Sequence, residues 1–121
     1  MAAAANKPFT IPFSGPISAL YAGEIASALI KAILKDHKGA PVFDMNGVFT
    51  TVREWVNIIK IIQPQAKIKI AGKPLLFPFH LSDQPLKNYI GNYDQATLQY
   101  GIKQTFDTFS SLLSKKKISF S

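Results

Sequence analysis

The sequence contains no cysteine, and this absence excludes a disulfide framework and any metal site built on thiolate ligands. No apolar run is long enough to cross a bilayer. The first residues, Met1–Ala5, lack the charged start and the long apolar core of a signal peptide. We therefore expect a cytoplasmic protein without a membrane partner, in which residues 1–6 are a disordered tail or an expression remnant.

Arginine is almost absent from this basic chain. Arg53 is the sole arginine among 14 basic residues, which outnumber the 7 acidic residues and give a net charge of +7. The lysines are scattered, apart from the run Lys115–Lys117 in a predicted basic tail over residues 115–121. Surfaces that bind nucleic acid usually gather arginine and aromatic residues on one face. We expect the lysines to be solvated, and we expect no nucleic acid partner.

Motifs for catalysis and for cofactor binding are also lacking. The acidic residues are scattered, and the two histidines lie far apart, without the spacing of a metal-binding helix. No Gly-x-Gly-x-x-Gly and no Gly-Lys-Ser/Thr sequence is present to hold a dinucleotide or a triphosphate. From the residues alone we predict no catalytic residue, no bound cofactor and no metal.

The most informative stretch that is present runs from Tyr21 to Leu34. Its apolar residues fall at positions 22, 25, 26, 29, 30 and 33, the spacing of one stripe along an α-helix. The opposite face carries Tyr21, Ala28 and Ala32 and is also nearly apolar. A helix that is apolar on most of its circumference is expected to be buried and covered on two sides. A chain of 121 residues offers little else to cover it.

The remaining patterns predict short strands interleaved with about four helices, and hence a mixed α/β fold in one domain. Thr51 and Glu54 form a capping box at the start of a helix that Pro64 ends. Gly101 lies inside the last helix, where close packing against a neighbour would explain it. The predicted strands are 8–13, 42–45 and 66–71, and 14–16 is a predicted turn. The predicted helices run from 21 to near 36–38, over 52–62 with Trp55 expected in the core, over 82–91 and over 97–114, and 75–81 is an irregular apolar loop.

The order of these patterns resembles the C-terminal half of an extended short-chain dehydrogenase, from the NAD-dependent epimerase/dehydratase superfamily. Each motif alone is weak, but their order and spacing over residues 7–114 are moderately specific. The matching segments are Tyr21-Ala22-Gly23-Glu24-Ile25-Ala26, Val42-Phe43-Asp44-Met45-Asn46-Gly47, Thr51-Val52-Arg53-Glu54, Ile90-Gly91, Thr97-Leu98 and Gly101-Ile102-Lys103-Gln104-Thr105-Phe106.

The resemblance implies a substrate-binding subdomain over residues 7–114 that is not catalytic by itself. The family's Gly-rich nucleotide loop and Tyr-x-x-x-Lys pair belong to an N-terminal Rossmann half, and no tyrosine here has lysine four residues on. The parent enzyme would be an NAD- or NADP-dependent sugar or nucleotide-sugar epimerase/dehydratase. Its missing Rossmann half is expected to dock on the face that carries Tyr21 and Ala28.

The resemblance also points to residues that would contact a small-molecule substrate. Sugar-nucleotide members of the family grip the diphosphate with arginines in segments that here are 14–20 and 72–79, which contain no arginine. A nucleotide sugar and a smaller hydroxy or keto compound therefore both stay open as the substrate. The loop 75–81 is a candidate substrate wall, with plain packing as the alternative. The candidate substrate-binding residues are Phe13, Ser14, Lys73, Phe77 and Phe79.

Two other interpretations of the sequence compete with this one. The chain could be a stand-alone homo-oligomeric binding or assembly module without enzymatic activity, in which a second copy covers the first helix. It could instead bind polyanions or a membrane surface through its lysines. One oligomeric species that does not change with protein concentration would identify the first, and a binding constant that collapses with salt would identify the second.

Overall fold

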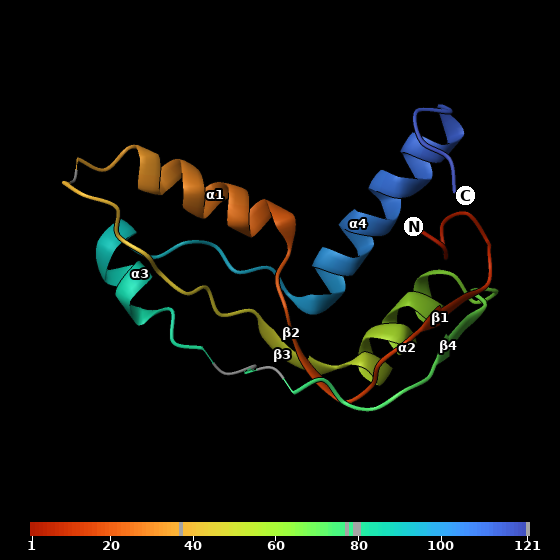
Figure 1. The fold of residues 1–121 in the computed structure, drawn as a ribbon. Coiled ribbons are helices and arrows are strands. Elements are labelled where there is room, and N and C mark those ends of the chain that lie inside the picture. Colours follow the sequence, from red (N-terminus) through yellow and green to blue (C-terminus); the bar gives the residue numbers. More distant parts are fainter. Residues whose placement is uncertain (37, 77, 79–80, 121) are drawn as a thin grey trace.

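The computed structural model describes residues 1–36, 38–76, 78 and 81–120. Figure 1 shows α1 and α3 side by side at one end of the molecule, and α2, α4, β1 and β4 toward the other, with β2 and β3 between them. The mixed α/β fold with four helices is confirmed. The elements, in chain order, are β1 (Phe9–Ile11), β2 (Pro16–Ala19), α1 (Ala22–Ile33), β3 (Val48–Thr51), α2 (Val52–Ile62), β4 (Ile68–Ile70), α3 (Gln84–Ile90) and α4 (Leu98–Ser114).

The strands form two separate two-stranded ribbons. β1 pairs in parallel with β4, with Phe9 opposite Ile68. β2 pairs antiparallel with β3, with Pro16 opposite Thr51. The sequence did not predict β2, because Pro16 was interpreted as part of a turn. Proline is tolerated as the first residue of a strand, and that is its position here.

The strand predicted over residues 42–45 is wrong. This segment is extended but pairs with no strand, and the observed strand β3 begins only at Val48. The alternation of the sequence is nevertheless real, because Phe43 and Met45 pack inward while Val42 is 93% exposed. Alternation of apolar and polar residues indicates which side chains face a core. A β-strand also needs a neighbouring strand to pair with, and the alternation does not show whether one is present.

Helix α1 forms, but it ends at Ile33 and not near residues 36–38, and the face that it buries is the one that was predicted to be open. Ala28, on the face that was expected to receive a Rossmann half, is only 3% exposed and packs on α3. The stripe at positions 22, 25, 26, 29, 30 and 33 instead lies in solvent, with Ile33 79% exposed. The small residues lie inside because α3 approaches α1 closely on that side, where larger side chains would not fit. The apolar stripe of α1, defined by these six positions, is an open surface.

The starts of α2 and α4 are capped as the sequence predicts. The Oγ1 of Thr51 accepts a hydrogen bond from the backbone N–H of Glu54 at 3.1 Å, and Thr97 accepts one from the N–H of Tyr100 at 3.2 Å. In a complete capping box the Glu54 carboxylate would accept a hydrogen bond from the backbone N–H of Thr51. Here it accepts one from the hydroxyl of Thr50 at 2.8 Å instead. Each cap satisfies a helix N–H that would otherwise lack a partner.

Three small clusters of buried residues take the place of one large core. Ala28, Leu86, Ile90 and Tyr93 lie between α1 and α3. The other two clusters are Ile11, Val52 and Val56, between β1 and α2, and Ile58, Leu98 and Ile102, between α2 and α4. Trp55, expected in the core, packs half-buried against the third cluster.

Close packing explains the glycine inside α4. A Cβ on Gly101 would lie 3.2 Å from the Cβ of Tyr21, which leads into α1. This contact confirms the expectation for Gly101 and brings the start of α1 against the first turn of α4. In the described part of the chain, no helix has the length and apolar character needed to cross a membrane.

Candidate functional site

Two of the predicted substrate-binding segments meet, although they are far apart in sequence. The hydroxyl of Ser14 donates a hydrogen bond to the carbonyl of Gly72 at 3.0 Å, and its backbone N–H donates to the carbonyl of Lys73 at 3.2 Å. Ser14 also forms an isolated parallel bridge with Pro74. We call the residues 13–15 and 72–74 the Ser14–Lys73 junction.

The junction depends on two glycines with positive φ. Gly15 has φ of +82°, and a Cβ there would lie 2.7 Å from the Cβ of Pro74. Gly72 has φ of +91°, and a Cβ there would collide with the backbone carbonyl oxygen of Pro12. Only glycine allows this backbone conformation and this approach without strain. The two segments therefore lie side by side with their backbones almost in contact.

The predicted site residues have different environments at the Ser14–Lys73 junction. Phe13 packs against the cluster of Ile11, Val52 and Val56, whereas Lys73 is exposed. Phe77 and Phe79 lie outside the described residues. In the same predicted wall, the side chain of Leu76 is 99% exposed. The structure thus brings Phe13, Ser14 and Lys73 together, with one cation at the surface of the junction.

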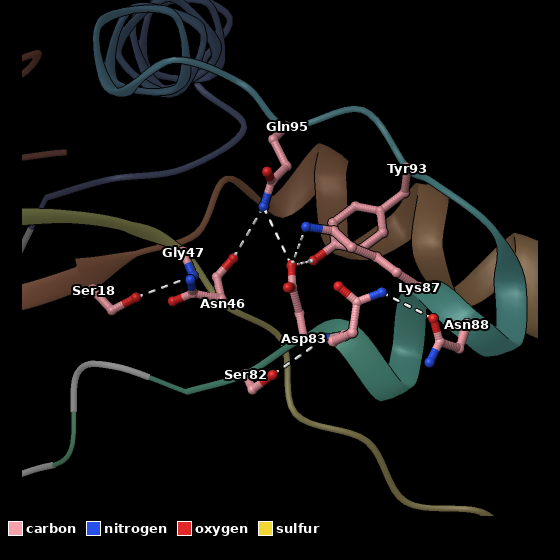
Figure 2. Close-up of polar contacts among 10 residues, drawn as sticks. Ser18, Asn46, Gly47, Ser82, Asp83, Lys87, Asn88, Tyr93 and Gln95 are labelled. Atoms are coloured by element: carbon pink, nitrogen blue, oxygen red, sulfur yellow. Dashed lines mark hydrogen bonds and ion pairs between the residues drawn. The ribbon is translucent and has the colours of Figure 1, made fainter.

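A buried polar cluster around Asp83 was not predicted. Figure 2 shows Lys87, Tyr93 and Gln95 turned toward its carboxylate. The Nζ of Lys87 lies 2.9 Å from Oδ2, the hydroxyl of Tyr93 donates to the same oxygen at 2.7 Å, and the side-chain amide of Gln95 donates to it at 3.5 Å. Gln95 also donates to the carbonyl of Asn46 at 3.4 Å. The cluster joins α3 to the segment that contains Asn46 and to the segment that contains Tyr93 and Gln95.

The charges in this cluster move two pKa values away from neutrality. Burial raises the pKa of Asp83, but the hydrogen bonds from Lys87 and Tyr93 and the charge of Lys87 lower it by more, so the net pKa lies below its usual range. Burial, followed by the hydrogen bond to Asp83, raises the pKa of Tyr93 to about 12. A general acid or base works best with a pKa near the working pH. The cluster is therefore arranged to hold structure together, and not to transfer protons at neutral pH.

Sequence reasoning placed Ser82–Pro85 at the start of a short helix but gave Asp83 no further role. The helix is there, yet the Asp83 side chain makes no capping hydrogen bond. Its partner Tyr93 lies beyond the helix, after Gly91, and nothing in the local pattern links the two. The signal that was available is the acid–base spacing of Asp83 and Lys87 on one helix face.

Glu24 ties the start of α1 to the approach to α4. Its side chain is buried, and one carboxylate oxygen accepts from the backbone N–H of Tyr21 at 3.0 Å. The other oxygen accepts a short hydrogen bond from the N–H of Ala96. The carboxylate therefore occupies the N-terminus of α1, the position at which a helix would otherwise receive a phosphate.

Side chains of the chain itself engage the starts of three helices. Glu24 occupies the start of α1, and the hydroxyls of Thr51 and Thr97 cap α2 and α4. A pyrophosphate site needs free backbone N–H groups after a glycine-rich turn. No group of three or more metal-ligating side chains occurs among the described residues either. We derive no chemical step through a cofactor or metal held by this chain.

Comparison with known proteins gives a likeness of fold. No protein-family profile and no curated protein matches the chain. Among solved structures, it is similar to a partial consensus L-threonine 3-dehydrogenase (E-change), with a TM-score of 0.71 and 15% sequence identity. The likeness covers 91% of this chain and 39% of that chain, so this chain spans about two fifths of its length. At this identity the likeness concerns the fold alone, and it agrees with the fold that the motifs predict.

Proposed function

We propose that this chain is the substrate-binding part of an NAD(P)-dependent oxidoreductase and is not catalytic by itself. One observation carries the proposal: the fold of almost the whole chain is like part of a dehydrogenase, at a TM-score of 0.71. The motif order over residues 7–114 supports it independently. NAD or NADP would bind to a nucleotide-binding part outside these residues, because the chain's own side chains engage the starts of α1, α2 and α4 and no glycine-rich nucleotide loop is present in the sequence.

The apolar stripe of α1 is the surface on which we place that nucleotide-binding part. The stripe exposes apolar side chains over three helical turns. Apolar patches of this kind on a protein surface usually mark a binding site. The solved dehydrogenase is more than twice as long as the stretch that matches this chain, so a fold of this type has a further part to supply. This placement replaces the Tyr21 and Ala28 face, because α3 already covers Ala28 and Tyr21 packs against Tyr100 of α4.

The substrate in this proposal is a small hydroxylated compound, and a sugar or nucleotide sugar fits the family resemblance. Lys73 would supply the cation for a phosphate or another anionic group, since it lies exposed at the Ser14–Lys73 junction. Lysine provides a point charge and not the two-pronged grip of arginine. Because lysine is the weaker phosphate ligand, a smaller hydroxy or keto compound is an alternative substrate in this proposal.

The first test is to read the source DNA in frame upstream of Met1 and express whatever coding sequence precedes it together with this chain. We expect a strand, a glycine-rich loop and a Tyr-x-x-x-Lys sequence, and reduction of NAD or NADP when hydroxylated substrates are supplied. A stop codon close upstream, with no separate gene product that restores this activity, would contradict the proposal.

Lys73 gives a sharper test in the assembled enzyme. Lys73→Ala is expected to raise KM for a phosphate-bearing substrate by about tenfold, the effect of losing one hydrogen bond from a charged group. Lys69→Ala removes another exposed lysine, from β4, and is the matched control. Equal KM values in the two variants would exclude Lys73 from the substrate site.

The exposed stripe also favours a second candidate function, a stand-alone module in which two copies bury α1 against each other. A module of that kind would sediment as one oligomeric species at all concentrations measured. A docking surface that lacks its partner would instead give weak self-association that grows with concentration.

A further inference from the structure

A pocket of 280 Å³ lies between α2, α4 and the β2–β3 ribbon. Trp55 and Ile59 of α2, Ile102 and Phe106 of α4, and Val48 of β3 form its apolar walls. Met1 and Leu20 also line it and are 40% and 37% exposed, so the pocket opens to solvent. The Ser14–Lys73 junction contributes no residue to it, which separates the pocket from the proposed substrate site.

Three of the polar side chains in the pocket wall, those of Glu24, Thr97 and Thr105, are engaged within the chain. The Glu24 carboxylate accepts hydrogen bonds from the backbone N–H groups of Tyr21 and Ala96. The hydroxyl of Thr97 accepts from the N–H of Tyr100, and the hydroxyl of Thr105 donates to the carbonyl of Gly101 at 2.8 Å. The described residues that line the pocket include no lysine or arginine. The α-amine of Met1 is a possible cation at the pocket, but burial lowers its pKa and so favours the neutral amine. A charged ligand would therefore lose its hydration for little gain in pairing.

The size and lining of the pocket define the ligand. A protein cavity of about 150 Å³ lined by apolar side chains is large enough to bind benzene. This pocket is larger and is lined by four aromatic residues, Tyr21, Trp55, Phe106 and Phe109, which favour contact with another ring. We propose that the pocket is a binding site for a neutral aromatic molecule of one or two rings. This site is additional to the proposed substrate site and does not depend on it.

Trp55 makes the proposal measurable in the 121-residue chain. It is the sole tryptophan of the chain, and it forms part of the pocket wall. Iodobenzene quenches tryptophan fluorescence on contact through its heavy atom, and it is neutral and has one ring. We expect titration with iodobenzene to quench Trp55 along a saturating curve. We expect 4-iodobenzoate, the same ring with a negative charge, to need about tenfold more ligand for half-saturation.

Two threonines of α4 provide a matched pair of variants. Thr105 lines the pocket and Thr108 does not, yet both are exposed and both donate to the carbonyl four residues earlier at 2.8 Å. Thr105→Phe introduces a ring at the pocket wall and is expected to weaken iodobenzene binding about tenfold or more. Thr108→Phe makes the same chemical change away from the pocket and is expected to leave binding unchanged.

The outcomes separate the proposal from its alternatives. Quenching that rises linearly without saturation, or equally in both threonine variants, would overturn it and mean that collision with the exposed part of Trp55 is the cause. If circular dichroism shows that Thr105→Phe does not fold, the comparison of iodobenzene with 4-iodobenzoate on the unmodified chain decides. Equal half-saturation for the two compounds would also overturn the proposal. None of these results depends on an enzymatic activity.

Discussion

Asp83 and Asp107 form the same kind of ion pair in two different environments. Each pairs with a lysine four residues away, but the Asp83–Lys87 pair is largely buried and the Lys103–Asp107 pair is about half exposed. We expect Asp83→Asn to lower the free energy of unfolding by about 1–3 kcal/mol, because a buried hydrogen-bond network loses its charge. Asp107→Asn is expected to cost less than about 1 kcal/mol, as exposed pairs usually do.

Urea unfolding of the two variants at neutral pH measures this difference. Equal losses would mean that burial adds nothing to the Asp83 pair. The lowered pKa of Asp83 makes its contribution present above the usual range of an aspartate and lost as the pH falls through the folded-state value.

Tyr93 gives a pH dependence of the opposite sign. Its pKa rises from 10.0 in the unfolded chain to about 12 in the folded protein, so folding favours the protonated phenol. This contribution to stability is complete below pH 10 and is lost as the pH rises through about 12. We expect the stability advantage of the unmodified chain over Tyr93→Phe to be constant below pH 10 and to shrink above it.

The measurement is the urea midpoint of both proteins between pH 9 and pH 12. Comparison with Tyr93→Phe removes the effect of lysines, which titrate in the same range in both proteins. A difference between the two proteins that stays constant across this range would contradict the hydrogen bond from Tyr93 to Asp83.

At the scale of elements, the apolar stripe of α1 can be tested against a matched helix position. Ile33 of α1 and Ile61 of α2 are both isoleucines and both 79% exposed. Because Ile33 belongs to the stripe, Ile33→Lys is expected to abolish self-association seen by sedimentation velocity, whereas Ile61→Lys leaves it unchanged. Neither variant is expected to change the unfolding free energy by more than about 0.5 kcal/mol. Association that both variants weaken equally would indicate nonspecific stickiness.

The helices were predictable because their signals are local. Threonine caps, a terminating proline and apolar periodicity placed α2 and α4 correctly. The strands were harder, because a strand exists only where a distant segment pairs with it. Residues 42–45 alternate without a partner, whereas Pro16–Ala19 found one in β3.

The direction in which α1 faces was also beyond sequence analysis. Both of its faces are apolar, and hydrophobicity alone favours burial of the larger side chains. The buried face of α1 is set by α3, which packs against Ala28 and leaves the isoleucines and Leu29 exposed. The size of a neighbouring element and the space it leaves are not encoded in the helix itself.

At the scale of the whole molecule, the candidate site was only partly predictable. The family resemblance brought Phe13, Ser14 and Lys73 into consideration, and they do lie together. The Asp83 cluster depends on how the segment after α3 folds back onto that helix, and the pocket beside Trp55 depends on the packing of α2 against α4. Residue patterns could identify their members as core or surface but could not bring them together.

The parallel pairing of β1 with β4 has a consequence for how the chain is made. Residues 9–11 pair with residues 68–70, and Glu24 closes against Ala96. During synthesis from the N-terminus, β1 therefore waits with its backbone groups unpaired until β4 has left the ribosome, and α1 waits longer for its tie to Ala96. Long-range pairings of this kind form slowly and leave strand edges open to other chains. Chaperone protection during translation would matter most for residues 9–24, which are made well before the segments that complete their contacts.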